Sequence, residues 1–191
     1  MCSFRERFRA PRPYDVGVTA PQGRPGLIGQ IKEDLALYDS WTRPGFQALA
    51  AHRIGVWRWR LPKPVRAPVS VGYLLAQLLI RNVYSIELTS RTAVGRRLRL
   101  AHEGGVMIHP DVVIGDDCLI RQNVTIGIVS DDATAAPKIG DRVEIGAGAV
   151  IIGGVTIGDD ARIGPNAVVT MNVPARGMAV STPARVIPAA D

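Results

Sequence analysis

Residues 139–169 read IGDRVEIGAGAVIIGGVTIGDDARIGPNAVV, and an aliphatic residue returns at every sixth position of this stretch. A small or aliphatic residue also stands four positions after each of the first five of these anchors. A period of six fits neither an amphipathic helix nor a simple alternating strand. It is the hexapeptide repeat of a parallel β-helix, in which each repeat supplies one short strand and one corner. Three repeats close one triangular coil, and successive coils stack about 4.8 Å apart. The anchors of this stretch are Ile139, Ile145, Ile151, Ile157, Ile163 and Val169.

The same period extends toward the N-terminus, with two interruptions. One adds two residues between Leu100 and Ile108 and contains His102. The other adds seven residues between Ile126 and Ile139, which predicts an external loop near 129–137. A solenoid tolerates insertions only where they leave the stack. We therefore expect His102 and the loop to lie near each other on the surface and to mark a site. The earlier anchors are Leu88, Val94, Leu100, Ile108, Ile114, Ile120 and Ile126.

The composition divides the chain near residue 86. Residues 1–85 hold 13 Lys and Arg against 5 Asp and Glu, whereas residues 86–191 hold 10 against 12. The arginines are scattered and are not interleaved with aromatics, so we expect no nucleic-acid partner. Two cysteines and no recognisable secretory leader favour a reducing, cytoplasmic location. No apolar stretch is long enough to span a bilayer, although the basic half could contact a membrane surface.

The basic half also has its own organisation. Residues 1–26 are rich in Pro and Gly and predict an irregular basic tail. Residues 27–85 show three helical stripes, which predict an α-helical cap whose tryptophans Trp41, Trp57 and Trp59 pack inside it. The β-helix then covers residues 86–187, and residues 188–191 form a short tail.

These patterns together resemble a known family. The helical segment beginning at Arg43, the coil that contains His102, and the ending Pro183-Ala-Arg-Val186 look like the serine acetyltransferases, which are left-handed β-helix acyltransferases. The stretch Ile120–Gly127, followed by a short Asp-containing loop and Ala136-Pro-Lys-Ile-Gly140, resembles more closely the branch that acetylates exopolysaccharide sugars, such as the colanic acid acetyltransferases. The resemblance implies an enzyme that uses acetyl-CoA, with a homotrimeric assembly and sites at the subunit interfaces. It leaves open whether trimers pair further.

An alcohol is a poor nucleophile at neutral pH, so acetyl transfer to a hydroxyl needs a general base. The sequence has three histidines. His102 matches the catalytic histidine of the family, while His52 lies in a helical stripe and His109 precedes a proline in a turn. We expect His102 to be the base and expect no metal site, because the three histidines lack a ligand pattern. The role of Glu103 beside the base stays open.

The resemblance also implies residues for coenzyme A. Gly127 falls where the family places backbone near the thioester, and the coil 146–148 has no bulky side chain to block the pantetheine arm. Arg162 and Arg185 match positions near the phosphates, for which arginine is well suited. The candidate coenzyme residues are Gly127, Gly146, Ala147, Gly148, Arg162 and Arg185.

The acceptor is the point where the sequence departs from serine acetyltransferases. Where those enzymes carry an Asp and an Arg-His pair for the amino acid, this chain has Ala101, Ala135 and Ala136. Burying a carboxylate or an ammonium without a partner costs several kcal/mol. We therefore expect a sugar hydroxyl of an exopolysaccharide or its precursor, with L-serine as the alternative acceptor and a non-catalytic scaffold as the alternative class. Asp39 could contact the acceptor. The tail after Val186 is short, so we expect no cysteine synthase complex.

Overall fold

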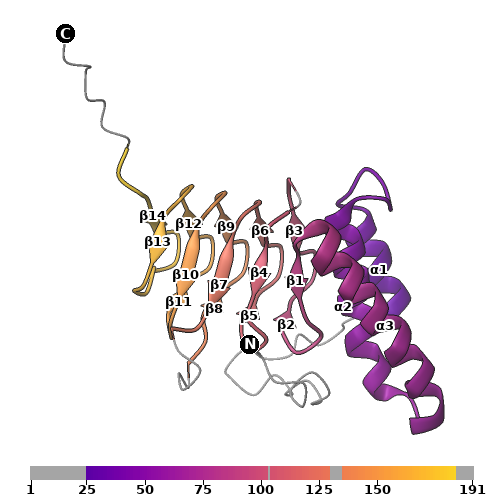
Figure 1. Cartoon of the computed structure of the whole chain (residues 1–191). Coiled ribbons are helices and arrows are strands. Elements are labelled where there is room, and N and C mark those ends of the chain that lie inside the picture. Colours follow the sequence, from indigo (N-terminus) through magenta and orange to yellow (C-terminus); the bar gives the residue numbers. More distant parts are fainter. Residues whose placement is uncertain (1–24, 103, 130–134, 184–191) are drawn as a thin grey trace.

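The computed structural model describes residues 25–102, 104–129 and 135–183. Within them, three α-helices precede a stack of short parallel strands (Figure 1). The helices are α1 (Leu27–Leu35), α2 (Pro44–Trp57) and α3 (Lys63–Tyr84), with a 3-10 turn, η2 (Arg58–Arg60), between α2 and α3. The strands are β1 (Glu87–Leu88), β2 (Ala93–Val94), β3 (Arg99–Leu100), β4 (Met107–Ile108), β5 (Val113–Ile114), β6 (Leu119–Ile120), β7 (Thr125–Gly127), β8 (Lys138–Ile139), β9 (Glu144–Ile145), β10 (Val150–Ile152), β11 (Thr156–Ile157), β12 (Arg162–Ile163), β13 (Val168–Val169) and β14 (Met178–Ala179).

The strands form the three faces of a prism. Sheet A has the order β1-β4-β7-β10-β13, sheet B the order β11-β8-β5-β2, and sheet C the order β14-β12-β9-β6-β3. The chain therefore visits each sheet once per coil. All pairings are parallel, and anchors pair with anchors, as Leu88 does with Ile108 and Ile114 with Ile139. The predicted β-helix is confirmed, and β14 extends it beyond the last anchor named from the sequence.

The prism interior is filled by the predicted anchors. Every anchor from Leu88 to Val169 is at most 3% exposed. Among the described residues, those four positions further on are buried with them except for Gly104, and they include Val112, Cys118 and Ala149. Neighbouring residues of a strand face opposite sides, so a two-residue strand buries only one side chain. Because each strand and its corner together take six residues, one inward aliphatic residue recurs at every sixth position. Burying an aliphatic side chain of this size contributes about 1.5–3 kcal/mol.

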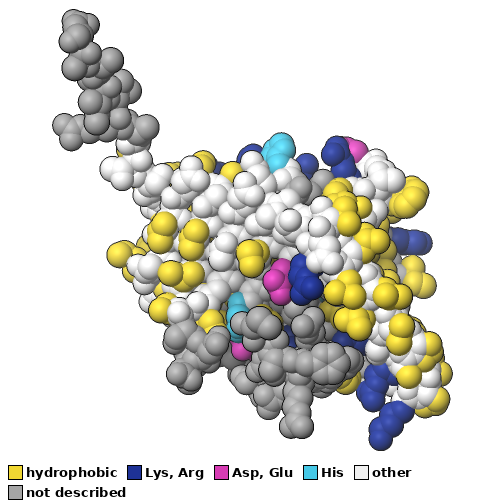
Figure 2. Space-filling view, in the orientation of Figure 1, with side chains coloured by type: hydrophobic (Ala, Val, Ile, Leu, Met, Phe, Trp, Pro, Cys, Tyr) yellow, Lys and Arg dark blue, Asp and Glu magenta, His cyan; other side chains and the backbone are white. Residues whose placement is uncertain are grey.

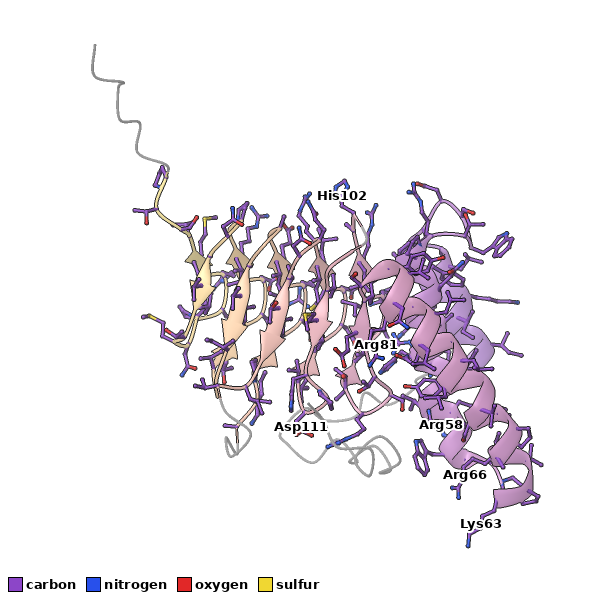
Figure 3. All side chains as sticks on the ribbon, viewed as in Figure 1. Arg58, Lys63, Arg66, Arg81, His102 and Asp111 are labelled. Atoms are coloured by element: carbon purple, nitrogen blue, oxygen red, sulfur yellow. The ribbon has the colours of Figure 1, made fainter. Side chains whose placement is uncertain are left out.

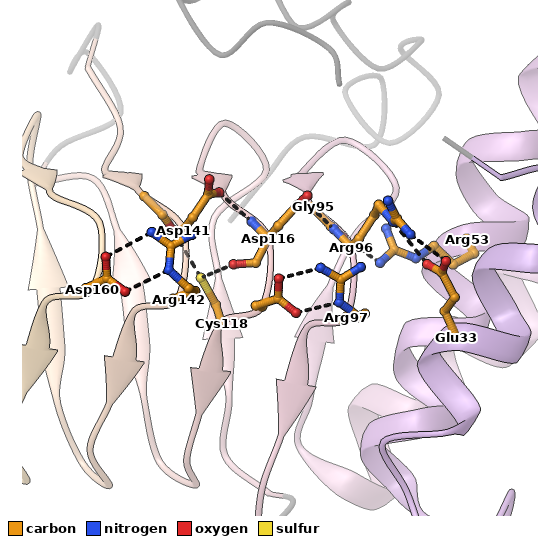
Figure 4. A network of polar contacts seen from close by, with 12 residues as sticks. Glu33, Arg53, Gly95, Arg96, Arg97, Asp116, Cys118, Asp141, Arg142 and Asp160 are labelled. Carbon is orange, nitrogen blue, oxygen red and sulfur yellow. Dashed lines mark hydrogen bonds and ion pairs between the residues drawn. The ribbon is translucent and has the colours of Figure 1, made fainter. Parts of the chain in front are cut away.

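The corner between sheets B and C carries a polar ladder along the stack (Figure 4). The Asp116 carboxylate accepts a hydrogen bond from the Arg96 N–H at 2.7 Å, and the Asp141 carboxylate accepts one from the Asp116 N–H at 2.8 Å. Beside it, arginine and aspartate side chains of successive coils pair in the same way, Arg97 with Asp117 and Arg142 with Asp160. This corner thus ties neighbouring coils together by side chains as well as by strand pairing.

The helical cap closes the first coil of the prism. Leu49 of α2 and Ile80 of α3 belong to the same buried cluster as the anchors. Arg53 is 5% exposed, and its Nε donates to the Asp34 carboxylate at 2.9 Å. The other guanidinium nitrogens of Arg53 donate to the carbonyls of Val94 and Gly95 at 3.0 and 2.6 Å. One buried side chain therefore joins α1, α2 and the prism.

Two expectations for the cap need correction. The third helical stripe of the sequence begins after Pro68, which predicts that the third helix begins there. Instead, α3 begins at Lys63 and contains Pro68, whose ring lies on the exposed side of the helix. Trp41 does not pack inside the cap, because its side chain is 69% exposed in the loop between α1 and α2. No helix in the described ranges is long and apolar enough to cross a bilayer. The predicted tails lie almost entirely outside the described residues.

A candidate acyl-transfer site at the junction of cap and prism

His102 lies in a two-residue bulge at the corner where the chain passes from sheet C to sheet A. In the regular coils this corner is a column of residues with left-handed backbone, including Asn123 (φ 57°) and Gly148 (φ 70°). Gly105 (φ 64°) occupies this position in the first coil. The position requires glycine, because a Cβ placed there would lie 2.3 Å from the Asn123 Oδ1. The insertion before Gly105 therefore leaves the stack and carries His102 outward, at the prism edge (Figure 3).

His102 itself has a left-handed backbone, with φ 56°. This conformation is uncommon for a residue with a side chain, although Asn, Asp and His adopt it more readily than others. Its ring makes no hydrogen bond to any described residue, so both ring nitrogens can engage a substrate. Glu103 lies outside the described residues.

The His102 bulge faces a hollow of about 150 Å³ between the prism and the loop that joins α1 to α2. The Leu100 N–H donates to the Tyr38 hydroxyl at 2.9 Å and fixes that loop against β3. Three charged residues line the hollow together with His102. Asp39 and Arg43 form an exposed ion pair with 3.4 Å between Oδ2 and Nη2, and Arg99 has no ion pair or side-chain hydrogen bond within the described residues. The full lining is Leu37, Tyr38, Asp39, Arg43, Arg99, Leu100, Ala101 and His102.

Four of the predicted coenzyme residues lie on the same side of the prism as His102. Gly146, Ala147 and Gly148 form the sheet C to sheet A corner two coils further along the stack. Arg162 stands on sheet C in the same register column as Arg99, three strands away, which is about 14 Å at the usual strand spacing. An extended chain placed along this edge would run from His102 past the small corner residues toward Arg162.

The glycines of this edge have a packing reason of their own. A Cβ on Gly146 would lie 2.6 Å from the Pro165 nitrogen, and one on Gly148 would lie 2.2 Å from the Asn166 Oδ1. Close stacking of successive corners thus excludes a side chain at both positions. Because no glycine side chain projects from this corner, its backbone stays accessible to a ligand. The structural role and the predicted ligand role of these glycines are therefore compatible.

Within one chain, Gly127 and His102 lie at different corners of the prism. Gly127 ends β7, where the chain leaves sheet A toward sheet B, whereas His102 lies at the opposite edge of sheet A. The expectation that the external loop lies near His102 is therefore wrong for a single chain, because the two insertions fall at different corners of the prism. No atom of the described residues beyond its chain neighbours lies within 4 Å of a Cβ placed on Gly127, so packing among these residues does not require glycine there. Residues 130–134 and Arg185 lie outside the described residues.

The other reactive side chains take no part in this site. His52 is 1% exposed, its Nε2–H donates to the Thr92 carbonyl at 3.0 Å, and burial lowers its pKa to about 3. His109 accepts a hydrogen bond from the Asp111 N–H within a turn, as expected. Burial raises the pKa of the Cys118 thiol to about 12, which makes a thiolate nucleophile unfavourable. Across the described ranges, no three His, Cys, Asp or Glu side chains group to hold a metal ion.

Sequence reasoning missed two residues of the hollow, Arg43 and Arg99. Arg43 begins the helical segment that carries the family resemblance and Arg99 lies in an ordinary hexapeptide, and neither position by itself predicts a role in the site. They meet only because the cap docks against β3. The hollow is therefore more cationic than the alanines at 101, 135 and 136 suggested.

Comparison with known proteins identifies the family. The model described as bacterial transferase hexapeptide (six repeats) matches residues 136–170. The Escherichia coli (strain K12) protein assigned as the colanic acid biosynthesis acetyltransferase WcaB is 37% identical over 160 residues, which cover 81% of this chain and 96% of that protein. The chain belongs to the hexapeptide-repeat acetyltransferases.

Serine acetyltransferases are similar to this hexapeptide-repeat acetyltransferase as well. That of Synechococcus elongatus is 35% identical over 145 residues, which cover 75% of this chain and 57% of the relative. The chain thus spans a little over half the length of the serine acetyltransferase it matches. The soybean serine acetyltransferase apoenzyme superposes with a TM-score of 0.70 and 32% identity over 86% of this chain and 70% of that chain. A serine acetyltransferase solved in complex with CoA superposes with a TM-score of 0.68 and 28% identity. The match covers 87% of this chain and 72% of that chain. The left-handed β-helix fold is confirmed.

Proposed function

We propose that this protein is an acetyl-CoA-dependent O-acetyltransferase whose acceptor is a sugar hydroxyl of an exopolysaccharide or its precursor. The observation that carries the proposal is the hollow in which His102 faces charged residues of the cap, in a chain that aligns with 96% of WcaB. The complex of a similar serine acetyltransferase with CoA supports acetyl-CoA as the donor.

His102 is the general base of the proposed reaction. A neutral ring nitrogen accepts the proton of the acceptor hydroxyl as its oxygen attacks the thioester carbonyl. The new C–O bond forms and the C–S bond breaks. The proton then passes from the imidazolium to the departing thiolate, so that the products are the O-acetyl ester and free CoA. The placement of His102 supports this role, because its ring has no hydrogen bond to a described residue and projects from the prism edge (Figure 3).

The donor lies along the corner between sheets C and A in this proposal. The corner formed by Gly146, Ala147 and Gly148 has no bulky side chain and accommodates the pantetheine arm. Arg162 is the cation available for the phosphates of CoA. Among the described residues, the ion-pair partner of Arg162 is Glu144, at 4.0 Å and at an exposed position, so the guanidinium can turn toward a ligand. We keep Arg185 as a second phosphate residue on the family resemblance. Gly127 would take part only from a neighbouring subunit, which supports a homotrimer with sites between subunits.

Two features favour a sugar as the acceptor. The alanines at 135 and 136 supply no partner for an amino acid. Arg43 and Arg99 favour a sugar that carries a carboxylate or phosphate.

L-Serine is the second candidate, because Arg99 could hold its carboxylate and Asp39 its ammonium. The two candidates separate in one experiment. Acetyl transfer is measured in parallel with L-serine, a neutral oligosaccharide and a uronic-acid oligosaccharide, with release of free CoA as the readout. We expect turnover with an oligosaccharide and none above background with serine. Saturable O-acetylserine formation at modest serine concentration would refute the sugar acceptor.

Calorimetry with CoA tests the alternative class, a non-catalytic scaffold. We expect CoA to bind, and binding should weaken on Arg162→Ala. A chain that binds no CoA and transfers no acetyl group would be a scaffold. Further expectations are a cytoplasmic location, which accords with the free thiol of Cys118, and no partnership with nucleic acid or cysteine synthase.

A further inference from the structure

Helix α3 carries an exposed apolar stripe along its length. Five large aliphatic residues of this helix are between 49% and 65% exposed. They recur at helical spacing, so they lie on one side of the helix, where Pro68 and Gly72 are exposed with them. From its first to its last member the stripe is about 27 Å long at 1.5 Å per residue. Its large members are Val65, Val71, Leu75, Leu79 and Val83.

A stripe of this kind is unusual on a surface in contact with water. Single exposed aliphatic residues are common, but a contiguous apolar surface marks an interaction site. Figure 2 shows these apolar side chains gathered over α3, with basic side chains at the far end of the helix. The stripe therefore predicts that a partner binds over this surface.

The charges around the stripe identify the chemistry of that partner. Residues 40–86 contain seven Arg and Lys and no Asp or Glu. Arg53 and Arg58 are buried and Arg43 pairs with Asp39. The cations without an acidic partner among the described residues are Arg60, Lys63, Arg66 and Arg81. Lys63 and Arg66 lie at the end of α3 that points away from the prism, and Arg81 lies near the prism (Figure 3). Lys63 and Arg81 are both exposed, near the two ends of α3. A surface that combines apolar side chains with unopposed cations fits an anionic surface with an apolar interior.

We propose that α3 is a membrane-docking helix that lies in the plane of an anionic lipid bilayer, with the stripe facing the acyl chains. An amphipathic helix with cations at its polar boundary binds such interfaces without spanning them. Basic residues near an anionic bilayer add to the attraction and make it sensitive to salt. The inference goes beyond the proposed function and does not depend on it.

The same charges argue against a second copy of α3 as the partner. In a twofold arrangement of antiparallel α3 helices, Lys63 and Arg66 of one chain would approach Arg81 of the other. No acidic residue of the segment 40–86 is available to offset this repulsion. A lipid headgroup layer supplies the missing negative charge, whereas a self-contact through this face concentrates positive charge.

Co-flotation of the full chain with lipid vesicles tests the proposal. One set of vesicles is phosphatidylcholine alone, and the other contains phosphatidylglycerol in phosphatidylcholine. We expect most of the protein to float with the anionic vesicles at low salt and at least a fivefold smaller fraction with neutral vesicles or at high salt. The variant Leu75→Ser/Leu79→Ser should lose binding at least fivefold, as should Lys63→Glu/Arg81→Glu.

The matched control is Met171→Ser/Val180→Ser, which removes two apolar side chains that are 72% and 69% exposed at the other end of the prism. It should float as the unmodified protein does. Light scattering of every variant accompanies the flotation. Failure of the unmodified chain to bind anionic vesicles would overturn the proposal, as would equal loss in the control. A change of subunit number in Leu75→Ser/Leu79→Ser would assign the stripe to a subunit interface instead and would equally overturn it.

Discussion

The Tyr38 hydroxyl accepts a hydrogen bond from the Leu100 N–H at 2.9 Å, two residues before His102. Leu100 lies on β3, at the end of sheet C, so its N–H has no strand beyond it to pair with. The cap loop thus completes the hydrogen bonding of the prism and at the same time brings Asp39 and Arg43 toward His102. The hollow at His102 depends on this contact between two parts of the chain.

Tyr38→Phe should therefore impair acceptor binding. The ring contact with Phe46, at 6.0 Å between centroids, is kept, but the Leu100 N–H loses its partner. We expect a loss of about 1–2 kcal/mol in unfolding free energy, together with a severalfold higher KM for the acceptor and an unchanged CoA affinity. Tyr73→Phe is the control, because the Tyr73 hydroxyl accepts from the Ser90 N–H at the same distance of 2.9 Å but does not line the hollow. An equal rise of KM in both variants would mean that the effect is general destabilisation.

His102→Asn should abolish acetyl transfer and keep the fold. Asn tolerates the left-handed backbone of this position, as Asn123 and Asn166 do in later coils, but it cannot accept the proton. We expect turnover to fall by about 10²–10⁴-fold, with CoA affinity retained in calorimetry. His109→Asn serves as the control and should stay active. Turnover within tenfold of the unmodified enzyme would exclude His102 as the base.

Arg99→Met should separate acidic from neutral acceptors. Methionine preserves much of the length of the side chain and removes its charge. We expect KM for a uronic-acid acceptor to rise about tenfold, equivalent to about 1.4 kcal/mol, with kcat little changed and neutral acceptors unaffected. Steady-state kinetics with a matched pair of oligosaccharides provides the measurement. A uniform loss across both acceptors would show that Arg99 does not select for charge.

The sequence alone predicts the prism well and the site only in part. The thirteen anchors are predictable because every hexapeptide obeys the same local rule, so burial at Leu88 and at Val169 follows from spacing. His102 is predictable because it interrupts that rule. Arg43 and Arg99 are not, because their proximity results from docking of the cap, which no local pattern encodes. Gly127 and His102 lie at opposite edges of sheet A, and this follows from counting the corners of the prism from His102 through the first insertion to Gly127.

Arg53→Met should destabilise the junction of cap and prism. The substitution leaves Asp34, which is 1% exposed, without its cation. Removing one partner of a buried ion pair lowers the free energy of unfolding by about 3–5 kcal/mol. The control is Arg43→Met, which removes one partner of the exposed pair with Asp39 and should lower it by less than about 1 kcal/mol. Urea unfolding measures both. The double variant Arg53→Met/Asp34→Leu should recover part of the loss, and no recovery would show that the bonds to Val94 and Gly95 dominate.

His52 should make the fold sensitive to acid. Burial lowers the pKa of His52 from 6.5 to about 3, with the positive charge of Arg53 as a second cause. The folded chain therefore keeps His52 neutral at pH values where the unfolded chain protonates it. Its contribution to stability is complete above about pH 6.5 and is lost progressively as the pH falls from 6.5 toward 3, by about 1.4 kcal/mol per pH unit.

His52→Gln isolates this effect, because the glutamine amide can donate to the Thr92 carbonyl but does not titrate between pH 4 and 8. Urea unfolding at pH 7.5, 6.5, 5.5 and 4.5 should give a free energy that falls more steeply for the unmodified protein than for the variant. The carboxylates whose pKa is lowered by arginine partners, such as Glu33 and Asp117, contribute equally to both chains and cancel in the comparison. Parallel curves for the two proteins would show that His52 is protonated in the folded state, in conflict with its burial against Thr92.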